Sequence, residues 1–268
     1  MNNTFGFIGA GNMGGALARA AAKAMDPANI ILADQLTEKA AALAGQIGCQ
    51  SQDAKTVAKT CRYIFLGVKP QVMEAMLSEI APVLAARTDS FVLVSMAAGV
   101  AIADIRQMAG AGYPVIRIMP NIPASVGGGV ILYDTTENVS AEAAKFFCES
   151  MRFAGLVDHL PEKLIDAGSA LSGCGPAFVS LFIEALADGA VACGLPRSQA
   201  VAYAAQTLAG TAKMILDSGI HPGALKDAVC SPGGTTIAGV NALEQGGFRA
   251  CAMEAVISAY QRTLELGK

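Results

Sequence analysis

The chain has 268 residues, which is enough for one or two domains with sizeable cores. Its formal net charge is -3, and its Lys and Arg residues are not clustered. This argues against nucleic acid or an anionic membrane as a partner and favours a small-molecule ligand. The seven cysteines are scattered and form no C-x-x-C pair, so we expect neither a disulfide framework nor a bound metal.

The positions of the charged residues bear on targeting signals and membrane-spanning segments. No charged side chain precedes Arg19, so the basic segment that opens a secretory signal is lacking, and we expect a cytoplasmic protein. The longest uncharged stretches, such as residues 167–183, contain Gly, Ser and Pro and fall short of the roughly 20 apolar residues of a spanning helix. We therefore expect no membrane-spanning segment.

From residue 4 to about residue 158, short apolar runs alternate with alanine-rich helical runs, which is typical of repeated strand–helix units around a parallel sheet. The apolar runs largely lack polar residues, as expected for strands that helices cover on both faces. We predict an α/β Rossmann domain with a mostly parallel, doubly wound sheet over residues 1–160. The six predicted strands are Thr4–Ile8, Ile30–Ala33, Tyr63–Leu66, Phe91–Ser95, Val115–Ile118 and Val130–Tyr133.

A glycine-rich segment follows the first predicted strand and precedes a helical run, the context that the G-x-G-x-x-G dinucleotide fingerprint requires. In this pattern Gly9 forms the tight turn, Gly11 lets a pyrophosphate approach the backbone, and Gly14 allows the helix to pack closely on the strand. The segment therefore predicts a nucleotide site. Its predicted contact residues are Ile8, Gly9, Ala10, Gly11, Asn12, Met13 and Gly14.

The second predicted strand is followed by Asp34, 20 residues after Gly14, where an acidic residue usually accepts a hydrogen bond from the adenosine ribose 2′-hydroxyl. A carboxylate there favours NAD and repels the 2′-phosphate of NADP. Yet Gln35, Thr37 and Lys39 can bind that phosphate if Asp34 turns away. Asp34 can also be a plain helix-capping residue, so the sequence predicts NADPH or NADH and leaves the preference open.

Small and polar residues follow the next three strands, at the carboxyl ends where ligands of open α/β sheets bind. They predict a nicotinamide site in this layer. Lys69 can instead be a solvated loop lysine, and the Asn121 side chain can hydrogen-bond its own turn. The residues concerned are Val68, Lys69, Pro70, Ala97 and Asn121.

From Pro161 onward the predicted strands stop, and helical runs follow one another to the end, so we predict an all-α domain over residues 161–268. In the run after Pro176, polar side chains recur every four residues, at Ser180, Glu184 and Asp188, and nearly all other residues are apolar or small. Such a helix must be covered on most sides. A half of about 105 residues cannot supply that cover alone, so we predict a homodimer with interleaved helices.

The helical half contains a small-residue turn that suits a carboxylate ligand. Ser231-Pro232 ends one helical run, Gly233-Gly234 lets backbone N–H groups approach a ligand, and Thr235 opens the next run at a positive helix end. An ordinary helix–helix connection uses the same residue types. The local pattern leaves both interpretations open.

Five motifs occur in order along nearly the whole chain, and the last of them is the most specific. They are Phe7–Met13, Val68–Pro70, Met119–Asn121, Leu171–Ala177 and His221–Thr236. With them the chain resembles the Δ1-pyrroline-5-carboxylate reductases. The resemblance implies an N-terminal Rossmann domain, a C-terminal helical dimerisation domain and, in many members, dimers that assemble into a decamer. It also implies reduction of 1-pyrroline-5-carboxylate to L-proline with NADPH or NADH, the last step of proline biosynthesis.

The resemblance also implies roles for particular residues. Thr236 matches the threonine whose hydroxyl contacts the ring nitrogen of the substrate, and Glu162 matches a substrate-site glutamate. Lys69 and Pro70 match a cofactor-contacting pair, and Ala97 lies in the corresponding contact strip. The turn that holds the substrate carboxylate matches Ser231, Gly234 and Thr235. The chain departs from the family at Asp34-Gln35, where serine and proline are common.

Two other functions remain as alternatives. A reductase like the β-hydroxyacid dehydrogenases joins the same two kinds of domain, but its catalytic lysine would lie in the helical half, where Lys163, Lys213 and Lys226 match no such motif. The second alternative is a non-catalytic NAD(P)-binding sensor, which would bind the nucleotide without turning over an imine.

Overall fold

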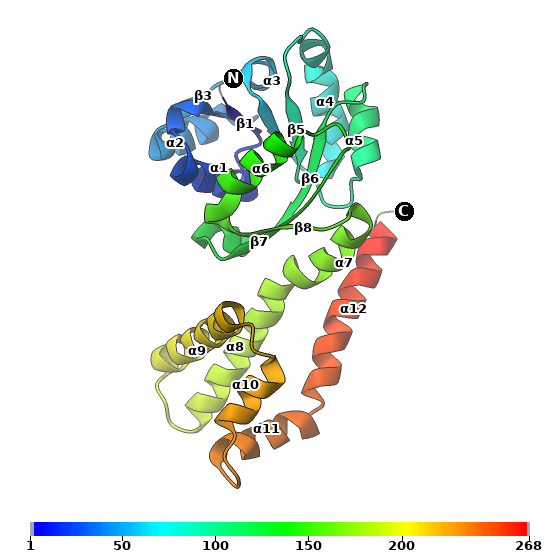
Figure 1. The fold of residues 1–268 in the computed structure, drawn as a ribbon. Coiled ribbons are helices and arrows are strands. Elements are labelled where there is room, and N and C mark those ends of the chain that lie inside the picture. Colours follow the sequence, from blue (N-terminus) through cyan, green and yellow to red (C-terminus); the bar gives the residue numbers. More distant parts are fainter. Residues whose placement is uncertain (1–2, 267–268) are drawn as a thin grey trace. The chain divides into compact units, whose positions relative to one another are not determined.

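The computed structural model describes residues 3–266, which fold into two compact units. The first unit runs up to Gly173 and takes up the chain again from Tyr260, and the second is Cys174–Ala259. Helix α7 (Glu162–Ser172) belongs to the predicted helical half but packs in the first unit, which therefore extends beyond the last strand to Gly173 (Figure 1). The boundary between residues 160 and 161 stays a prediction.

The first unit is built on one eight-stranded sheet, which confirms the predicted α/β class. Its spatial order is β3-β2-β1-β4-β5-β6-β7-β8, and all neighbours are parallel except β6 and β7, which are antiparallel. The six predicted strands are present, and two more were missed at the sheet edges. The strands are β1 (Phe5–Ile8), β2 (Ile30–Ala33), β3 (Gln50–Ser51), β4 (Tyr63–Leu66), β5 (Val92–Ser95), β6 (Val115–Pro120), β7 (Gly129–Thr135) and β8 (Gly155–His159).

Helices cover both faces of this sheet, so its central strands are buried on both sides. One face packs against α1 (Asn12–Ala24), α2 (Thr37–Ile47) and α6 (Ala141–Met151). The other packs against α3 (Ala54–Thr60), α4 (Pro70–Ala85) and α5 (Ile102–Ala109). Short 3-10 turns η1 (Pro27–Asn29), η2 (Ile122–Val126) and η3 (Arg152–Ala154) complete the unit.

The first strand shows why these residues make a central strand. Phe5 and Phe7 lie in the core on one face, whereas Ile8 lies in the core on the other. The rings of Phe7 and Phe65 are stacked 4.2 Å apart across β1 and β4. Burying each of these aromatic side chains contributes roughly 2–3 kcal/mol to folding. The apolar run Phe5–Ile8 is thus a strand because both of its faces are needed inside.

Helix α7 packs on the antiparallel end of the sheet. Ile165 is fully buried against Met119 of β6 and Leu132 of β7. Gly168 permits this close approach, because a Cβ atom there would lie 2.5 Å from Cδ1 of Leu132. The helix that begins the helical half is therefore fixed to the Rossmann sheet.

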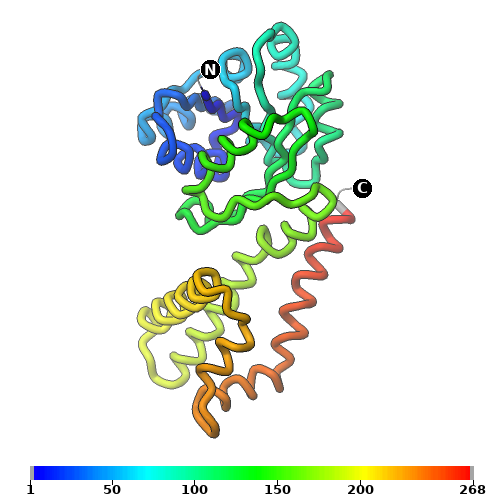
Figure 2. The backbone as a smooth tube through the Cα atoms, viewed as in Figure 1, coloured from blue at the N-terminus to red at the C-terminus, as the bar shows by residue number. Residues whose placement is uncertain are grey.

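The second unit is entirely helical, as predicted (Figure 2). It contains α8 (Gly175–Ala192), α9 (Arg197–Ser218), α10 (Pro222–Val229), α11 (Thr235–Gln245) and most of α12 (Phe248–Leu266). Among its described side chains only Ala187, Ala200 and Ala204 are buried. Large apolar side chains such as Leu181 and Leu216 are 67% and 78% exposed in the single chain.

One helical run of the described residues, 162–192, is long and apolar enough to cross a membrane by length and composition alone. Only 11% of its most apolar window is buried inside the chain. A helix that another protein chain covers has the same composition, so this property alone does not distinguish lipid from a protein partner.

Candidate functional site

The glycine turn between β1 and α1 has a backbone that other residues cannot adopt. Gly9 has φ +106°, and a Cβ atom there would lie 2.4 Å from the carbonyl oxygen of Gly67. A Cβ atom on Gly14 would lie 2.1 Å from the carbonyl oxygen of Gly9. These two glycines therefore let the turn, the helix and the loop after β4 pack against one another.

Gly11 is different, because a Cβ atom there would meet no atom within 4 Å. Gly11 is the N-cap residue of α1, and because it has no side chain it cannot cap the first backbone N–H groups of the helix. Open space at a positive helix end is what a nucleotide pyrophosphate needs. Of the flanking predicted contacts, Ile8 and Ala10 are buried, Met13 is half-buried and Asn12 is exposed.

A groove of about 410 Å³ lies beside this turn, between α1 and α2. Gly11, Asn12 and Lys39 are among the residues that line it. Arg19 also lines the groove, and its Nη2 atom donates to Oε1 of Gln46 at 2.5 Å. The groove continues the nucleotide turn toward the first helical turns of α2.

Asp34 lies directly after β2, and its carboxylate joins two loops. Oδ2 accepts from the backbone N–H of Ala10 at 2.8 Å, and Oδ1 accepts from that of Leu36 at 3.0 Å. Asp34 thus holds the glycine turn against the entry to α2. The neighbouring Gln35 is exposed and has no hydrogen bond to another described side chain.

The predicted nicotinamide residues lie at the carboxyl ends of β4, β5 and β6. Lys69 is exposed at the N-cap of α4 and precedes Pro70 at the first helical position, and its side chain has no hydrogen bond or ion pair among the described residues. Val68 is half-buried and Ala97 is buried. Asn121 is buried, and its side chain donates to the Ser172 carbonyl at 2.8 Å and accepts from a strand N–H.

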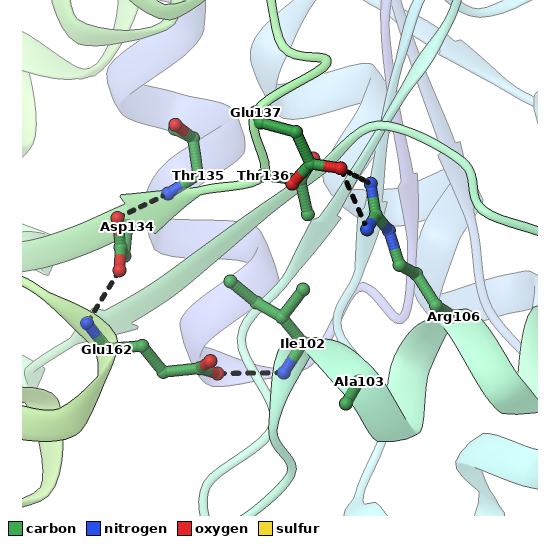
Figure 3. A pocket seen from close by; sticks show the side chains of 8 residues that line it. All are labelled: Ile102, Ala103, Arg106, Asp134, Thr135, Thr136, Glu137 and Glu162. Carbon is green, nitrogen blue, oxygen red and sulfur yellow. Dashed lines mark hydrogen bonds and ion pairs between the residues drawn. The ribbon is translucent and has the colours of Figure 1, made fainter.

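Glu162, a predicted substrate residue, begins helix α7 in the first unit. Its Oε1 atom accepts from the backbone N–H of Ile102 at 2.7 Å and from Nη1 of Arg117 at 3.1 Å. Its own N–H donates to Oδ2 of Asp134 at 2.6 Å. Figure 3 shows the contacts of Glu162 with Ile102 and with Asp134. These residues and Arg106 line a cavity of about 510 Å³.

Arg117 is a residue that sequence reasoning missed. It is 4% exposed, and its guanidinium contacts Glu162 and, through Nη2, Oδ1 of Asp166 one turn later at 3.1 Å. Its Nε atom is buried without a partner among the described residues. The sequence did hold a signal, because Arg117 is the only charged residue in the six predicted strands. A buried arginine in an apolar strand requires carboxylate partners.

The predicted substrate turn lies in the second unit, between α10 and α11. Gly233 has φ +66°, and the N–H of Gly234 donates to the Ser231 carbonyl at 3.0 Å. A Cβ atom on Gly234 would lie 2.3 Å from Oγ of Ser231, so a larger residue there would displace the Ser231 hydroxyl. Helix α11 then starts at Thr235 with no side-chain cap, which leaves an anion-binding helix end.

The hydroxyls of this turn are available to a ligand. Thr236 is half-buried, Thr235 and Ser231 are exposed, and the structure gives none of the three side chains a hydrogen-bond partner among the described residues. One turn earlier, the hydrogen bond to Asp227 raises the pKa of Lys226. His221 caps α10, since its Nδ1 accepts from Gly223 N–H at 3.0 Å.

The structure thus assembles the predicted site residues in two groups. The nucleotide turn, Asp34, the strand-end residues and Glu162 lie in the first unit, whereas the turn from Ser231 to Thr236 lies in the second. Within residues 3–266, no group of three or more His, Cys, Asp or Glu side chains could hold a metal ion.

Two family models match the chain. Residues 162–266 match pyrroline-5-carboxylate reductase dimerisation, and residues 4–99 match NADP oxidoreductase, coenzyme F420-dependent. A pyrroline-5-carboxylate reductase of Methanosarcina acetivorans is 41% identical over 270 residues, covering 100% of this chain and 99% of the relative.

Solved structures agree over the same length. A pyrroline-5-carboxylate reductase from Coxiella burnetii has a TM-score of 0.92 at 31% identity and is covered over 100% of both chains. The Plasmodium falciparum pyrroline carboxylate reductase with NADP bound has a TM-score of 0.86 at 31% identity, covering 100% of this chain and 99% of that one. With a nucleotide turn in one unit and a small-residue turn at an uncapped helix end in the other, the chain belongs to the pyrroline-5-carboxylate reductase family.

Proposed function

We propose that this protein reduces 1-pyrroline-5-carboxylate to L-proline with NADPH or NADH. The observation that carries the proposal is that one chain combines the open helix end at Gly11 with the open helix end at Thr235. The first suits a pyrophosphate and the second a carboxylate. The full-length similarity to reductases of this name supports the same reaction.

The residues of the first unit fit a dinucleotide. Gly11 leaves room for the pyrophosphate at the α1 N-terminus, and the small residues after β4 and β5 leave room for the nicotinamide ring. When bound, the reduced nicotinamide supplies a hydride to the imine carbon. Val68, Lys69, Pro70, Ala97 and Asn121 are the residues we propose beside this ring.

The turn from Ser231 to Thr236 holds the substrate in this proposal. The backbone N–H groups that open α11, beginning with that of Thr235, face the substrate carboxylate at the positive end of the helix. The hydroxyl of Thr236 hydrogen-bonds the ring nitrogen, which carries a proton in the imine and keeps it in the amine product. Because a protonated imine is already electrophilic, orientation is the main task of the protein.

Glu162 is the substrate residue that we propose in the first unit. Its Oε1 atom already accepts from Ile102 N–H and Arg117, and a carboxylate has further lone pairs for a substrate. The hydrogen bond to Ile102 also fixes the loop between β5 and α5, which carries Ala97. We propose that Glu162 acts mainly by holding this loop in place.

The first experiment measures loss of nicotinamide absorbance with pyrroline-5-carboxylate, in parallel with NADPH and NADH. Turnover supports the proposal. If folded protein binds nucleotide but does not turn over this imine, the reductase assignment fails. Turnover of a β-hydroxyacid would then indicate the related dehydrogenase reaction, and binding alone would indicate a sensor.

Thr236→Ala tests the residue assignment. We expect kcat/KM to fall at least about tenfold, near 1.4 kcal/mol, because the substrate nitrogen loses its hydrogen-bond partner. Thr236→Ser keeps the hydroxyl and is expected to retain most of the activity. Thermal unfolding of both variants shows whether the fold is intact, and unchanged kinetics in the alanine variant contradict the role.

Assembly and location belong to the same proposal. The apolar surface of the second unit supports a homodimer, and the decamer of other family members is proposed for this chain by resemblance. We also propose a cytoplasmic enzyme whose apolar 162–192 run is covered by its partner subunit rather than by a membrane. Sedimentation velocity and cell fractionation test these points.

A further inference from the structure

The carboxylate of Asp34 is held in place by two backbone N–H groups, one on each side. Ala10 lies in the nucleotide turn, and Leu36 lies at the entry to α2. Hydrogen bonds to an ionised acceptor are stronger than neutral ones. If the side chain rotated away, both contacts would be lost, so the negative charge stays fixed beside the nucleotide turn.

At this position the Asp34 carboxylate would contact the adenosine ribose of a bound dinucleotide. In a βαβ nucleotide fold, the acidic residue after the second strand lies next to the ribose 2′-oxygen. A carboxylate has about four lone-pair positions, and the two backbone N–H groups occupy two of them. The others remain free to accept from a 2′-hydroxyl, whereas a 2′-phosphate offers only acceptors and negative charge.

The surrounding cations do not offset this charge well. Residues 34–38 contain no Lys or Arg. Arg19 in the adjacent groove lies about two helical turns along α1 from Gly11, where its side chain donates to Gln46. Lys39 is exposed on α2, where its charge is screened by water and salt.

We propose that Asp34 makes this protein select NADH over NADPH. The proposal rests on the proposed nucleotide site and adds the identity of the cofactor to it. From the sequence, binding of the 2′-phosphate of NADPH required Asp34 to turn away. In the structure the Asp34 carboxylate instead accepts from Ala10 N–H in the nucleotide turn.

Binding measurements test the preference independently of turnover. Fluorescence titration of the full-length protein with NADH and NADPH is expected to give a Kd for NADH at least about tenfold lower. Competition with 5′-AMP and with 2′,5′-ADP isolates the 2′-phosphate, and 5′-AMP is expected to bind more tightly. Equal or tighter binding of the phosphorylated ligands overturns the proposal without any variant.

Asp34→Ser removes the charge and keeps a short side chain that can accept a hydrogen bond. We expect the ratio of the two Kd values to move toward NADPH by at least about tenfold. The matched control is Asp53→Ser, because Asp53 also accepts from a backbone N–H, that of Thr56, but caps α3. Its Kd ratio is expected to stay at the wild-type value.

The outcomes separate this proposal from the reductase assignment. If Asp34→Ser leaves the ratio unchanged in folded protein, Asp34 does not set the preference. If wild-type protein prefers NADH but does not reduce the imine, the cofactor proposal holds and the reaction assignment fails. If it reduces the imine faster with NADPH and binds NADPH more tightly, the reverse is true.

Discussion

Gly11 and Gly14 are both part of one fingerprint, but they are glycines for different physical reasons. Gly14 lacks a side chain because the backbone of Gly9 occupies that space. Gly11 lacks one although the space is empty in the protein. Because the open space at Gly11 lies at the positive end of α1, we expect a ligand to use it.

This difference gives a paired prediction. Gly11→Ala is expected to change the free energy of unfolding by less than about 1 kcal/mol, because its backbone suits alanine and no atom is displaced. It is expected to weaken nucleotide binding at least about tenfold. Gly14→Ala is expected to destabilise the fold by about 3 kcal/mol, because its Cβ meets a backbone oxygen. Thermal unfolding and nucleotide titration check both, and equal behaviour of the two variants would contradict the interpretation.

The site residues show which parts of a site a sequence can predict at this scale. The nucleotide turn was identified because its glycine spacing is local and tied to a backbone shape. The partners of Asp34 and Arg117 could not be identified in this way. Asp34 bonds Ala10 across 24 residues, and Arg117 bonds Glu162 and Asp166 across 45 and 49. Such contacts depend on the path of the whole chain.

Polar contacts join helix α7 to residues of the sheet unit at both ends of the helix. Arg117 holds its first turns through Glu162 and Asp166, and Asn121 holds its last carbonyl, that of Ser172. Between these points Ile165 is buried against the sheet. A helix that composition assigns to the helical half is therefore packed as part of the first unit.

Gly168→Ala tests this packing. The new Cβ would lie 2.5 Å from Leu132 and 3.0 Å from Leu160, so we expect a loss of about 1–2 kcal/mol in the free energy of unfolding despite the better helix propensity of alanine. Gly45→Ala in α2 is the matched control, because its Cβ meets no atom within 4 Å. It is expected to be neutral or stabilising by up to about 1 kcal/mol. Urea denaturation of both variants decides between packing and propensity.

The two strands that sequence reasoning missed have physical explanations. β3 spans only Gln50–Ser51, and its polar residues carry no strand pattern. β8 is largely exposed along Gly155–His159 and pairs with β7 on one side only. Edge strands are defined by the neighbour that pairs with them rather than by their own hydrophobicity.

The two units differ in how completely they bury their apolar side chains. The first unit has cores on both faces of its sheet, whereas the helices of the second unit expose large apolar side chains in a single chain. Exposed apolar surface of this extent marks an interaction site in a water-soluble protein. The match to a dimerisation model over residues 162–266 supports the proposal that the partner is a second copy of the chain.

Leu181→Glu tests this interface. Leu181 is 67% exposed on α8, and a carboxylate there is expected to dissociate the dimer, because a charge without a partner cannot be buried in an apolar interface. Val126→Glu is the control, since Val126 is 83% exposed in the first unit. Sedimentation velocity is expected to show a monomer for the first variant and the wild-type mass for the second. A dimer in both would place the interface elsewhere.

The sequence by itself determined the six inner strands, the change to an all-helical half, the nucleotide turn, the small-residue turn from Ser231 to Thr236 and the family. These features are local, because backbone conformation and hydrophobic patterning are set by neighbouring residues. Only the tertiary structure decided that Asp34 faces the nucleotide turn, that Arg117 is buried between two carboxylates and that α7 belongs to the sheet. Each of these depends on residues far apart in the chain, whose meeting is fixed by the packing of the whole unit.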